Sequence, residues 1–124
     1  KYASFIKKID DEAVLSDPNR VKAVFDTNNN ALWFSRYPLP YLQGIEKDRL
    51  THHDFYYHVG VYFFRKAALI EYHHWPQSSH EKAESLEQLR ILDNHKAIRL
   101  FKIKDRVLSI DTPEDLNEVE KYIL

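Results

Sequence analysis

An aspartate stands between an apolar run and a predicted helix in the stretch SIDTPEDL, where Asp111 follows Ile110. Thr112 can cap this helix and Pro113 suits its first position, so the helix start does not need the Asp111 carboxylate. Ligands bind at the C-terminal edge of strands in open α/β sheets, and a carboxylate there is an oxygen ligand suited to Mg²⁺. The residue types therefore indicate either a magnesium ligand or a turn aspartate beside a helix dipole.

Two apolar runs carry polar side chains that could bind an anion. Arg36 ends the run ALWFSR before Pro38, where a guanidinium can bind a carboxylate or phosphate through two hydrogen bonds, or simply lie at the surface. His58 opens the run HVGVYFF and can be a hydrogen-bonded core residue or a donor to an anion. Tyr62 follows four residues later and, in a strand, points to the same face as His58.

A third group of polar residues adjoins a leucine stripe in the stretch EKAESLEQLRIL. Glu84 and Gln88 are one helical turn apart, and Glu87 lies between Leu86 and Gln88. Such side chains at the margin of a buried face could hold sugar hydroxyls. Charged residues that flank an apolar stripe are also the ordinary pattern of a solvated helix face.

Other common kinds of site are not favoured by the sequence. There are seven histidines, but neither adjacent pair, His52–His53 or His73–His74, chelates a metal easily in a strand or a helix. There is no H-E-x-x-H spacing and no cysteine, which argues against a zinc site. The chain also contains no glycine-rich phosphate loop and no G-x-S-x-G nucleophile motif.

The polar residues belong to strands and helices that can be read from periodicity. Strands are predicted over residues 2–9 and 55–64, and a β-hairpin over 21–40 turns at the Asn-rich stretch DTNNN. Residues 41–54 are polar and predict a loop with at most a short helix. Helix formers predict a helix over 65–75, which ends before Pro76.

The remaining third of the chain contains the clearest predicted helix. It covers residues 78–94 and begins with a capping box formed by Ser78 and Glu81. Residues 97–110 follow as two short strands, and a helix from Thr112 closes the chain. This order of elements predicts an α/β fold in which helices flank a mixed sheet.

Composition limits the partners of the chain. With 124 residues, of which 44% are hydrophobic and 30% charged, it fits one domain or part of one. The net charge of -1 gives no reason to expect nucleic acid or an acidic membrane as a partner. No segment is apolar over the length of a membrane span, and the lack of cysteine is compatible with a reducing compartment. We therefore expect a cytoplasmic protein.

Four stretches in this order resemble one enzyme family: NALWFSRYPLP, HVGVYFFRK, EKAESLEQLRIL and IDTPEDLNEVE. They are similar to the C-terminal half of 3-deoxy-manno-octulosonate cytidylyltransferases, the CMP-Kdo synthetases, and the resemblance covers essentially the whole chain. It implies a nucleotide-diphospho-sugar transferase-like fold. It also implies a nucleotidyltransferase that forms CMP-Kdo and pyrophosphate from CTP and the acid sugar Kdo, in lipopolysaccharide precursor biosynthesis.

The resemblance implies roles for the residues singled out above. Asp111 would be a catalytic residue and the Mg²⁺ ligand, and the protein would be a homodimer. Five residues would bind Kdo: Arg36, His58, Tyr62, Glu87 and Gln88.

The chain also departs from the family pattern. The nucleotide-binding segments of the family have no counterpart here, so we expect residues 1–124 to be the C-terminal part of a cytidylyltransferase, inactive by itself. Tyr41, Leu42 and Gln43 follow PLP where the family carries an aromatic residue, an aspartate and a nearby basic residue. The sugar could therefore differ, as in an 8-amino-Kdo or CMP-sialate type of enzyme. A non-catalytic sugar-acid-binding or dimerisation module is the other alternative.

Overall fold

The computed structural model describes residues 2–104, 113–114 and 117. Asp111, the second of the two predicted final strands and most of the predicted C-terminal helix lie outside the described residues.

A five-stranded sheet forms the centre of the described chain, with strand order β3-β2-β4-β1-β5. β1 pairs in parallel with β5, whereas the β1–β4, β4–β2 and β2–β3 pairs are antiparallel. The prediction of a mixed sheet is therefore confirmed. The strand bounds are Tyr2–Lys8 for β1, Lys22–Phe25 for β2, Ala31–Ser35 for β3, Tyr56–Phe64 for β4 and Ile98–Ile103 for β5.

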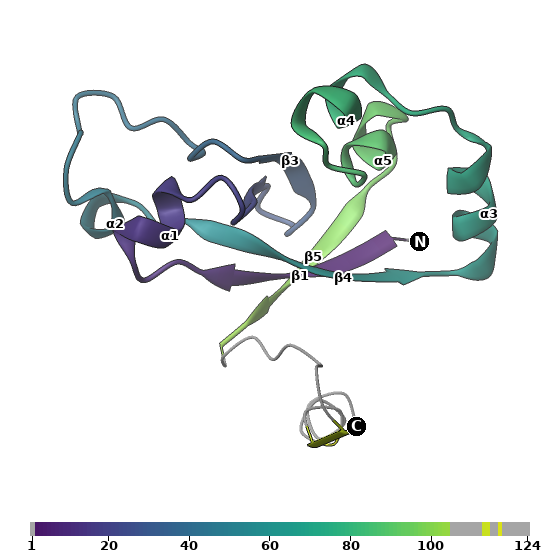
Figure 1. Cartoon of the computed structure of the whole chain (residues 1–124), viewed down its shortest axis with the longest axis horizontal. Coiled ribbons are helices and arrows are strands. Elements are labelled where there is room, and N and C mark those ends of the chain that lie inside the picture. The colour runs from purple at the N-terminus through teal and green to yellow at the C-terminus, as the bar shows by residue number, and fades with distance from the viewer. Residues whose placement is uncertain (1, 105–112, 115–116, 118–124) are drawn as a thin grey trace.

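The described helices lie on one side of this sheet (Figure 1). Their bounds are Glu12–Ser16 for α1, Arg49–His52 for α2, Lys66–His74 for α3, Ser79–Glu84 for α4 and Leu89–Asp93 for α5. The predicted helix after the fourth strand is confirmed as α3. α1 was not predicted, although Asp11 caps it by accepting from the backbone N–H of Ala13. None of the described helices has the length and apolar character that a membrane span requires.

The predicted hairpin is confirmed, and its turn depends on Asp26. The Asp26 carboxylate accepts from the backbone N–H groups of Asn28 and Asn30, both over 2.9 Å. Asn29 takes the left-handed conformation with φ 62°, which asparagine tolerates better than most residues. An Asx turn thus replaces the glycine that tight hairpins commonly use.

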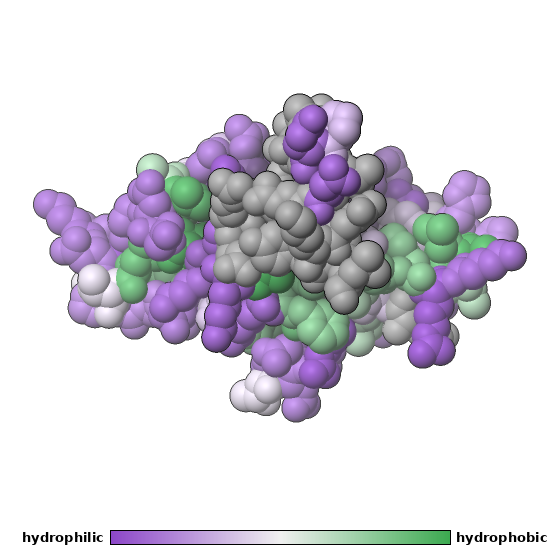
Figure 2. All heavy atoms as spheres, turned by 90° about the horizontal axis from the view of Figure 1, so that it is seen from below, coloured by the Kyte–Doolittle hydropathy of each residue, from purple (hydrophilic) through white to green (hydrophobic). Residues whose placement is uncertain are grey.

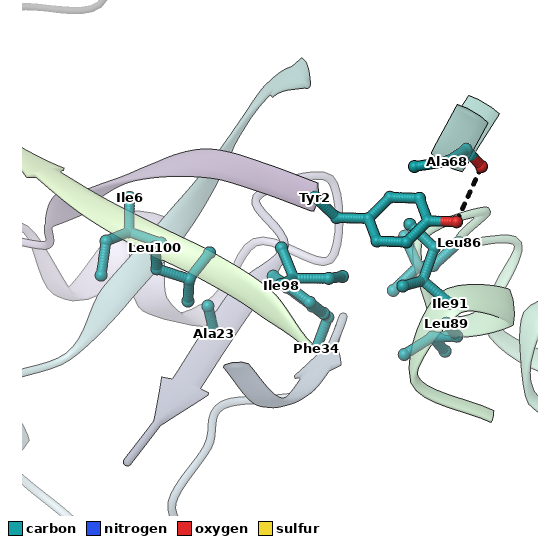
Figure 3. Close-up of a cluster of buried hydrophobic side chains, with 10 residues drawn as sticks. All are labelled: Tyr2, Ile6, Ala23, Phe34, Ala68, Leu86, Leu89, Ile91, Ile98 and Leu100. Carbon is teal, nitrogen blue, oxygen red and sulfur yellow. Dashed lines mark hydrogen bonds between the residues drawn. The ribbon is translucent and has the colours of Figure 1, made fainter. Parts of the chain in front are cut away.

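The hydrophobic core lies between the sheet and the helices. β1 alternates between buried and half-buried residues, so that Tyr2, Ser4 and Ile6 face the core. Figure 3 shows Leu100 of β5 beside Ile6, and the Tyr2 hydroxyl donating to the carbonyl of Ala68 over 2.8 Å. Ile98 of β5 pairs with Tyr2 of β1. Leu86, Leu89 and Ile91 belong to the same cluster. This packing fixes the α4–α5 region over the sheet.

The helix predicted over residues 78–94 is wrong in one respect, because the chain forms two short helices there. The capping box of Ser78 and Glu81 is present at the start of α4, but Ser85 takes the left-handed conformation with φ 55° and ends that helix. The carbonyls of Glu84 and Ser85 accept from the Arg36 guanidinium. Since Arg36 follows β3 and is distant from Ser85 in the sequence, the break could not be read from local propensity.

Candidate functional site

A pocket of about 400 Å³ opens beside the middle of β4. This volume lies within the usual range for small-molecule sites. Its wall is formed by the loop before β2, by β4 and by the turn between α4 and α5. The lining residues are Asn19, Arg20, Val21, Tyr57, His58, Val59, Gly60, Tyr62, Leu86 and Gln88.

A bulge in β4 shapes one side of this pocket. Ser4 of β1 pairs with Tyr62 and the next residue, Phe5, pairs with Val59, so β4 has extra residues between the two pairs. The His58 and Tyr62 ring centroids are 5.2 Å apart across the bulge. The prediction that His58 and Tyr62 share a face of the strand is confirmed.

A chain of hydrogen bonds links four side chains at this wall. The Tyr62 hydroxyl donates to Gln88 Oε1 over 3.1 Å, and Gln88 Nε2 lies 3.5 Å from His58 Nδ1. His58 Nε2 lies 2.7 Å from Ser4 Oγ, and Ser4 donates its own hydrogen to the carbonyl of Val61 over 2.6 Å. These directions require a neutral His58 that carries its hydrogen on Nε2 and accepts at Nδ1.

Burial favours the uncharged form of both rings. It lowers the pKa of His58 from the ordinary value of 6.5 to about 4. Burial also raises the pKa of Tyr62, and the nearby negative charge of Glu87 adds to this rise. At neutral pH this wall therefore offers neutral donors and acceptors. Gln88 Nε2 has a second hydrogen and Tyr62 has oxygen lone pairs with which hydroxyl groups of a ligand can pair.

Arg36 ties the two rims of the pocket together. Its Nε donates to the carbonyl of Glu84 over 2.7 Å and its Nη2 to the carbonyl of Ser85 over 3.1 Å. Its Nη1 donates to the carbonyl of Pro18 over 2.9 Å, in the loop before β2. The guanidinium thereby holds the turn that carries Gln88 at a set distance from the opposite loop. Arg36 itself is not among the lining residues.

Lys22 at the start of β2 fixes the loop that precedes this strand. Its side chain is fully buried, and Nζ donates to the carbonyls of Asp17 and Arg20 over 2.8 and 2.6 Å. Burial lowers the pKa of Lys22. Together with Arg36, this amine orders the backbone of residues 17–20, which forms one wall of the pocket.

The structure brings together three of the predicted sugar ligands: His58, Tyr62 and Gln88. Glu87 adjoins them with an exposed side chain, while its carbonyl accepts from the Tyr72 hydroxyl over 3.2 Å. The pairing of Glu84 with Gln88 on one helix face is wrong, because the break at Ser85 separates them. Glu84 instead accepts from the Ser35 hydroxyl over 2.9 Å and from the backbone N–H of Arg36 over 3.2 Å.

The predicted magnesium site is not among the described residues. No three His, Asp or Glu side chains within the described part of the chain are grouped to hold a metal ion. Asp111 lies outside that part. A magnesium ion held by Asp111 therefore stays a prediction from the sequence, and the described residues supply no ligand set for it.

Sequence reasoning missed three contributors to the site. Ser4 lies in the buried phase of β1, where a small polar residue among apolar ones is a signal of a buried hydrogen bond. Lys22 opens an apolar strand, which is a weaker signal of the same kind. Arg20 carried no recognisable pattern, because its place at the pocket depends on how the loop folds.

Comparison with known proteins assigns the family. A family model described as cytidylyltransferase matches residues 1–100. The chain belongs to the cytidylyltransferase family. The resemblance noted in the sequence and the α/β fold class are thereby confirmed, and a solved structure supports both. It is titled as CMP:2-keto-3-deoxy-manno-octonic acid synthetase complexed with CTP, and it superposes with a TM-score of 0.77 at 34% identity over 98% of this chain.

Curated members of the family carry the same activity in their names. The 3-deoxy-manno-octulosonate cytidylyltransferase of Porphyromonas gingivalis is 42% identical over 110 residues, which are 88% of this chain and 43% of that protein. The protein of the same name from Bacteroides thetaiotaomicron is 43% identical over 112 residues, 90% of this chain and 45% of its own length. The chain thus spans less than half of these relatives, and 48% of the solved structure.

Proposed function

We propose that the protein containing this chain transfers CMP from CTP to Kdo. The sugar hydroxyl oxygen would attack the α-phosphorus of CTP, forming a C–O–P bond to the sugar while the bond to the β-phosphate oxygen breaks and pyrophosphate leaves. The hydroxyl proton is released to water or to a base. The described residues would supply the sugar side of this reaction, because the pocket beside β4 offers neutral donors and acceptors that suit a hydroxylated ligand.

One observation carries the proposal: the chain from Tyr62 through Gln88 and His58 to Ser4 is neutral and directional. A polyol needs matched donors and acceptors in fixed positions rather than charge. Because each side chain in this hydrogen-bonded series orients the next one, the pocket is preorganised before the sugar binds. Glu87 adjoins this wall and would accept a further sugar hydroxyl. Arg36 was predicted to contact the sugar directly. Its hydrogen bonds to the carbonyls of Glu84 and Ser85 would in any case position the turn that carries Gln88.

Steady-state kinetics with Gln88→Leu tests the sugar site. The purified protein should form CMP-Kdo and pyrophosphate from CTP and Kdo. The variant should raise the KM for Kdo by roughly tenfold, since it removes an amide that pairs with neutral groups, and should leave the KM for CTP unchanged.

The exposed Gln77 offers a matched control for that experiment. Gln77→Leu should leave both KM values as in the wild type. An equal rise of both values in Gln88→Leu, together with a lower melting temperature, would instead show that Gln88 only supports the fold. Parallel assays with 8-amino-Kdo and sialate decide which acid sugar is preferred.

The proposal includes a homodimer. Figure 2 views the molecule from the side opposite the described helices, and hydrophobic patches show among hydrophilic side chains on either side of the area drawn in grey. Phe63 of β4 and Phe101 of β5 are 42% and 48% exposed. Exposed apolar surface of this kind is typical of an interface between copies. A cytoplasmic location belongs to the same proposal, because the reaction consumes CTP.

Light scattering measures the association directly. The wild-type protein should have twice the mass of one chain at micromolar concentration. Phe101→Asp should shift it towards the monomer, because the charge would have to be buried in the interface. Tyr41→Asp, at an exposed position of the loop before α2, should not. A monomeric wild type would contradict the dimer.

A further inference from the structure

The pocket beside β4 contains one formally charged side chain among its described lining residues, and this residue is Arg20. His58, the other titratable base of the lining, is held neutral by burial. An acid sugar carries a carboxylate in addition to its hydroxyl groups. A site with a neutral wall for hydroxyls therefore still needs one cation, placed away from that wall.

The other cations near the pocket are already engaged. Arg36 donates to three backbone carbonyls, and Lys22 donates to two while fully buried. Arg20 differs because its side chain is exposed and forms no ion pair with a carboxylate of the described residues. Its guanidinium carbon lies 5.4 Å from the centre of the Tyr57 ring, and Tyr57 also lines the pocket.

The backbone of Arg20 is fixed although its side chain is exposed. Its N–H donates to the carbonyl of Asp17 over 3.0 Å, and its own carbonyl accepts from Lys22. Asp17 also accepts, through its carboxylate, from the N–H of Asn19 over 2.9 Å. An exposed cation on a fixed loop can bind a ligand at a small cost in conformational entropy, since only the side chain has to be ordered.

We propose that Arg20 binds the carboxylate of the acid sugar. A guanidinium can hold both carboxylate oxygens through parallel hydrogen bonds. The sugar would then lie across the pocket, with its carboxylate at Arg20 and its hydroxyls at Tyr62 and Gln88. This assignment rests on the proposed function, and it makes Arg20 a substrate-binding residue that determines the preference for an acid over a neutral sugar.

Substitution of Arg20 tests the assignment through the two KM values. Arg20→Gln should raise the KM for Kdo about tenfold or more, because a charge-assisted hydrogen-bonded pair is lost, and should leave the KM for CTP unchanged. Arg20→Lys should give an intermediate value, since lysine keeps the charge without the paired donors. The wild-type KM for Kdo should also rise with salt, and Arg20→Gln should lose most of this dependence.

Arg99→Gln provides the control, because Arg99 is an exposed arginine of β5 that does not line this pocket. It should behave as the wild type. Turnover of Kdo with an unchanged KM in Arg20→Gln would overturn the assignment and leave the proposed function standing. An equal rise of both KM values would also overturn it, by showing a general disturbance of the loop. A wild-type protein that forms no CMP-Kdo would overturn the proposed function, and this assignment with it.

Discussion

Replacing Glu81 by glutamine is expected to lower the free energy of unfolding by about 3 kcal/mol, because the largely buried Arg90 guanidinium would lose its charge partner. Glu81 is 3% exposed, and Arg90 donates to its two carboxylate oxygens over 2.8 and 2.6 Å. Glutamine keeps the length of the side chain and can still accept from the backbone N–H of Ser78. Urea unfolding at neutral pH measures the difference.

Acid should weaken the same ion pair. The hydrogen bonds from Arg90 hold the pKa of Glu81 below its usual range. A carboxylate with a lowered pKa contributes its stability above the unfolded-state value, and this contribution is lost as the pH falls through the folded-state pKa. The wild type should therefore lose part of its stability below about pH 4.5, and Glu81→Gln should lose less.

The exposed pair of Lys8 and Asp54 serves as the control for this experiment. Asp54→Asn should leave the unfolding midpoint almost unchanged, because exposed ion pairs contribute little. If Glu81→Gln unfolded at the same urea concentration as the wild type, the ion pair of Glu81 and Arg90 would not stabilise the packing of α4 against α5 as its burial indicates.

The ion pair of Glu81 and Arg90 matters for the site because the turn with Gln88 lies between α4 and α5. The capping box that starts α4 could be predicted, since Ser78 and Glu81 are three residues apart. The end of α4 could not. It depends on the Arg36 guanidinium and on the left-handed Ser85, which bring together residues about fifty positions apart in the sequence.

The same distinction separates the predicted from the unpredicted parts of the pocket. His58 and Tyr62 were found because a strand has a period of two residues. The bulge that brings their rings close and the placement of Gln88 against them arise only when β4 pairs with β1 and α5 packs on the sheet. Arg20 belongs to the loop before β2, whose carbonyls accept from the buried Lys22 at the start of β2 and from Arg36. This arrangement has no local sequence pattern.

Lowering the pH from neutral to about 5 is expected to remove about 2 kcal/mol of stability through His58 alone. Burial lowers the pKa of His58 from 6.5 to about 4. The unfolded chain therefore binds a proton at this histidine in a pH range where the folded chain does not. The contribution of His58 to stability is fully present above its unfolded-state pKa, and it is lost as the pH falls towards its folded-state pKa. Urea unfolding at a series of pH values measures this slope.

His58→Phe removes the titrating group but keeps a ring that can pack against Phe34, whose centroid lies 5.0 Å from the His58 ring. The variant should lose the part of the pH dependence of stability that His58 causes, even if its free energy of unfolding is lower than that of the wild type at every pH. His74→Phe, at the exposed end of α3, should keep this part of the slope.

An unchanged slope in His58→Phe would mean that His58 takes up its proton as readily in the folded protein as in the unfolded chain. A proton on Nδ1 would then face the amide hydrogens of Gln88, and Gln88 could not donate to His58 while it accepts from Tyr62. The neutral wall assigned to the sugar hydroxyls therefore depends on the same slope that this experiment measures.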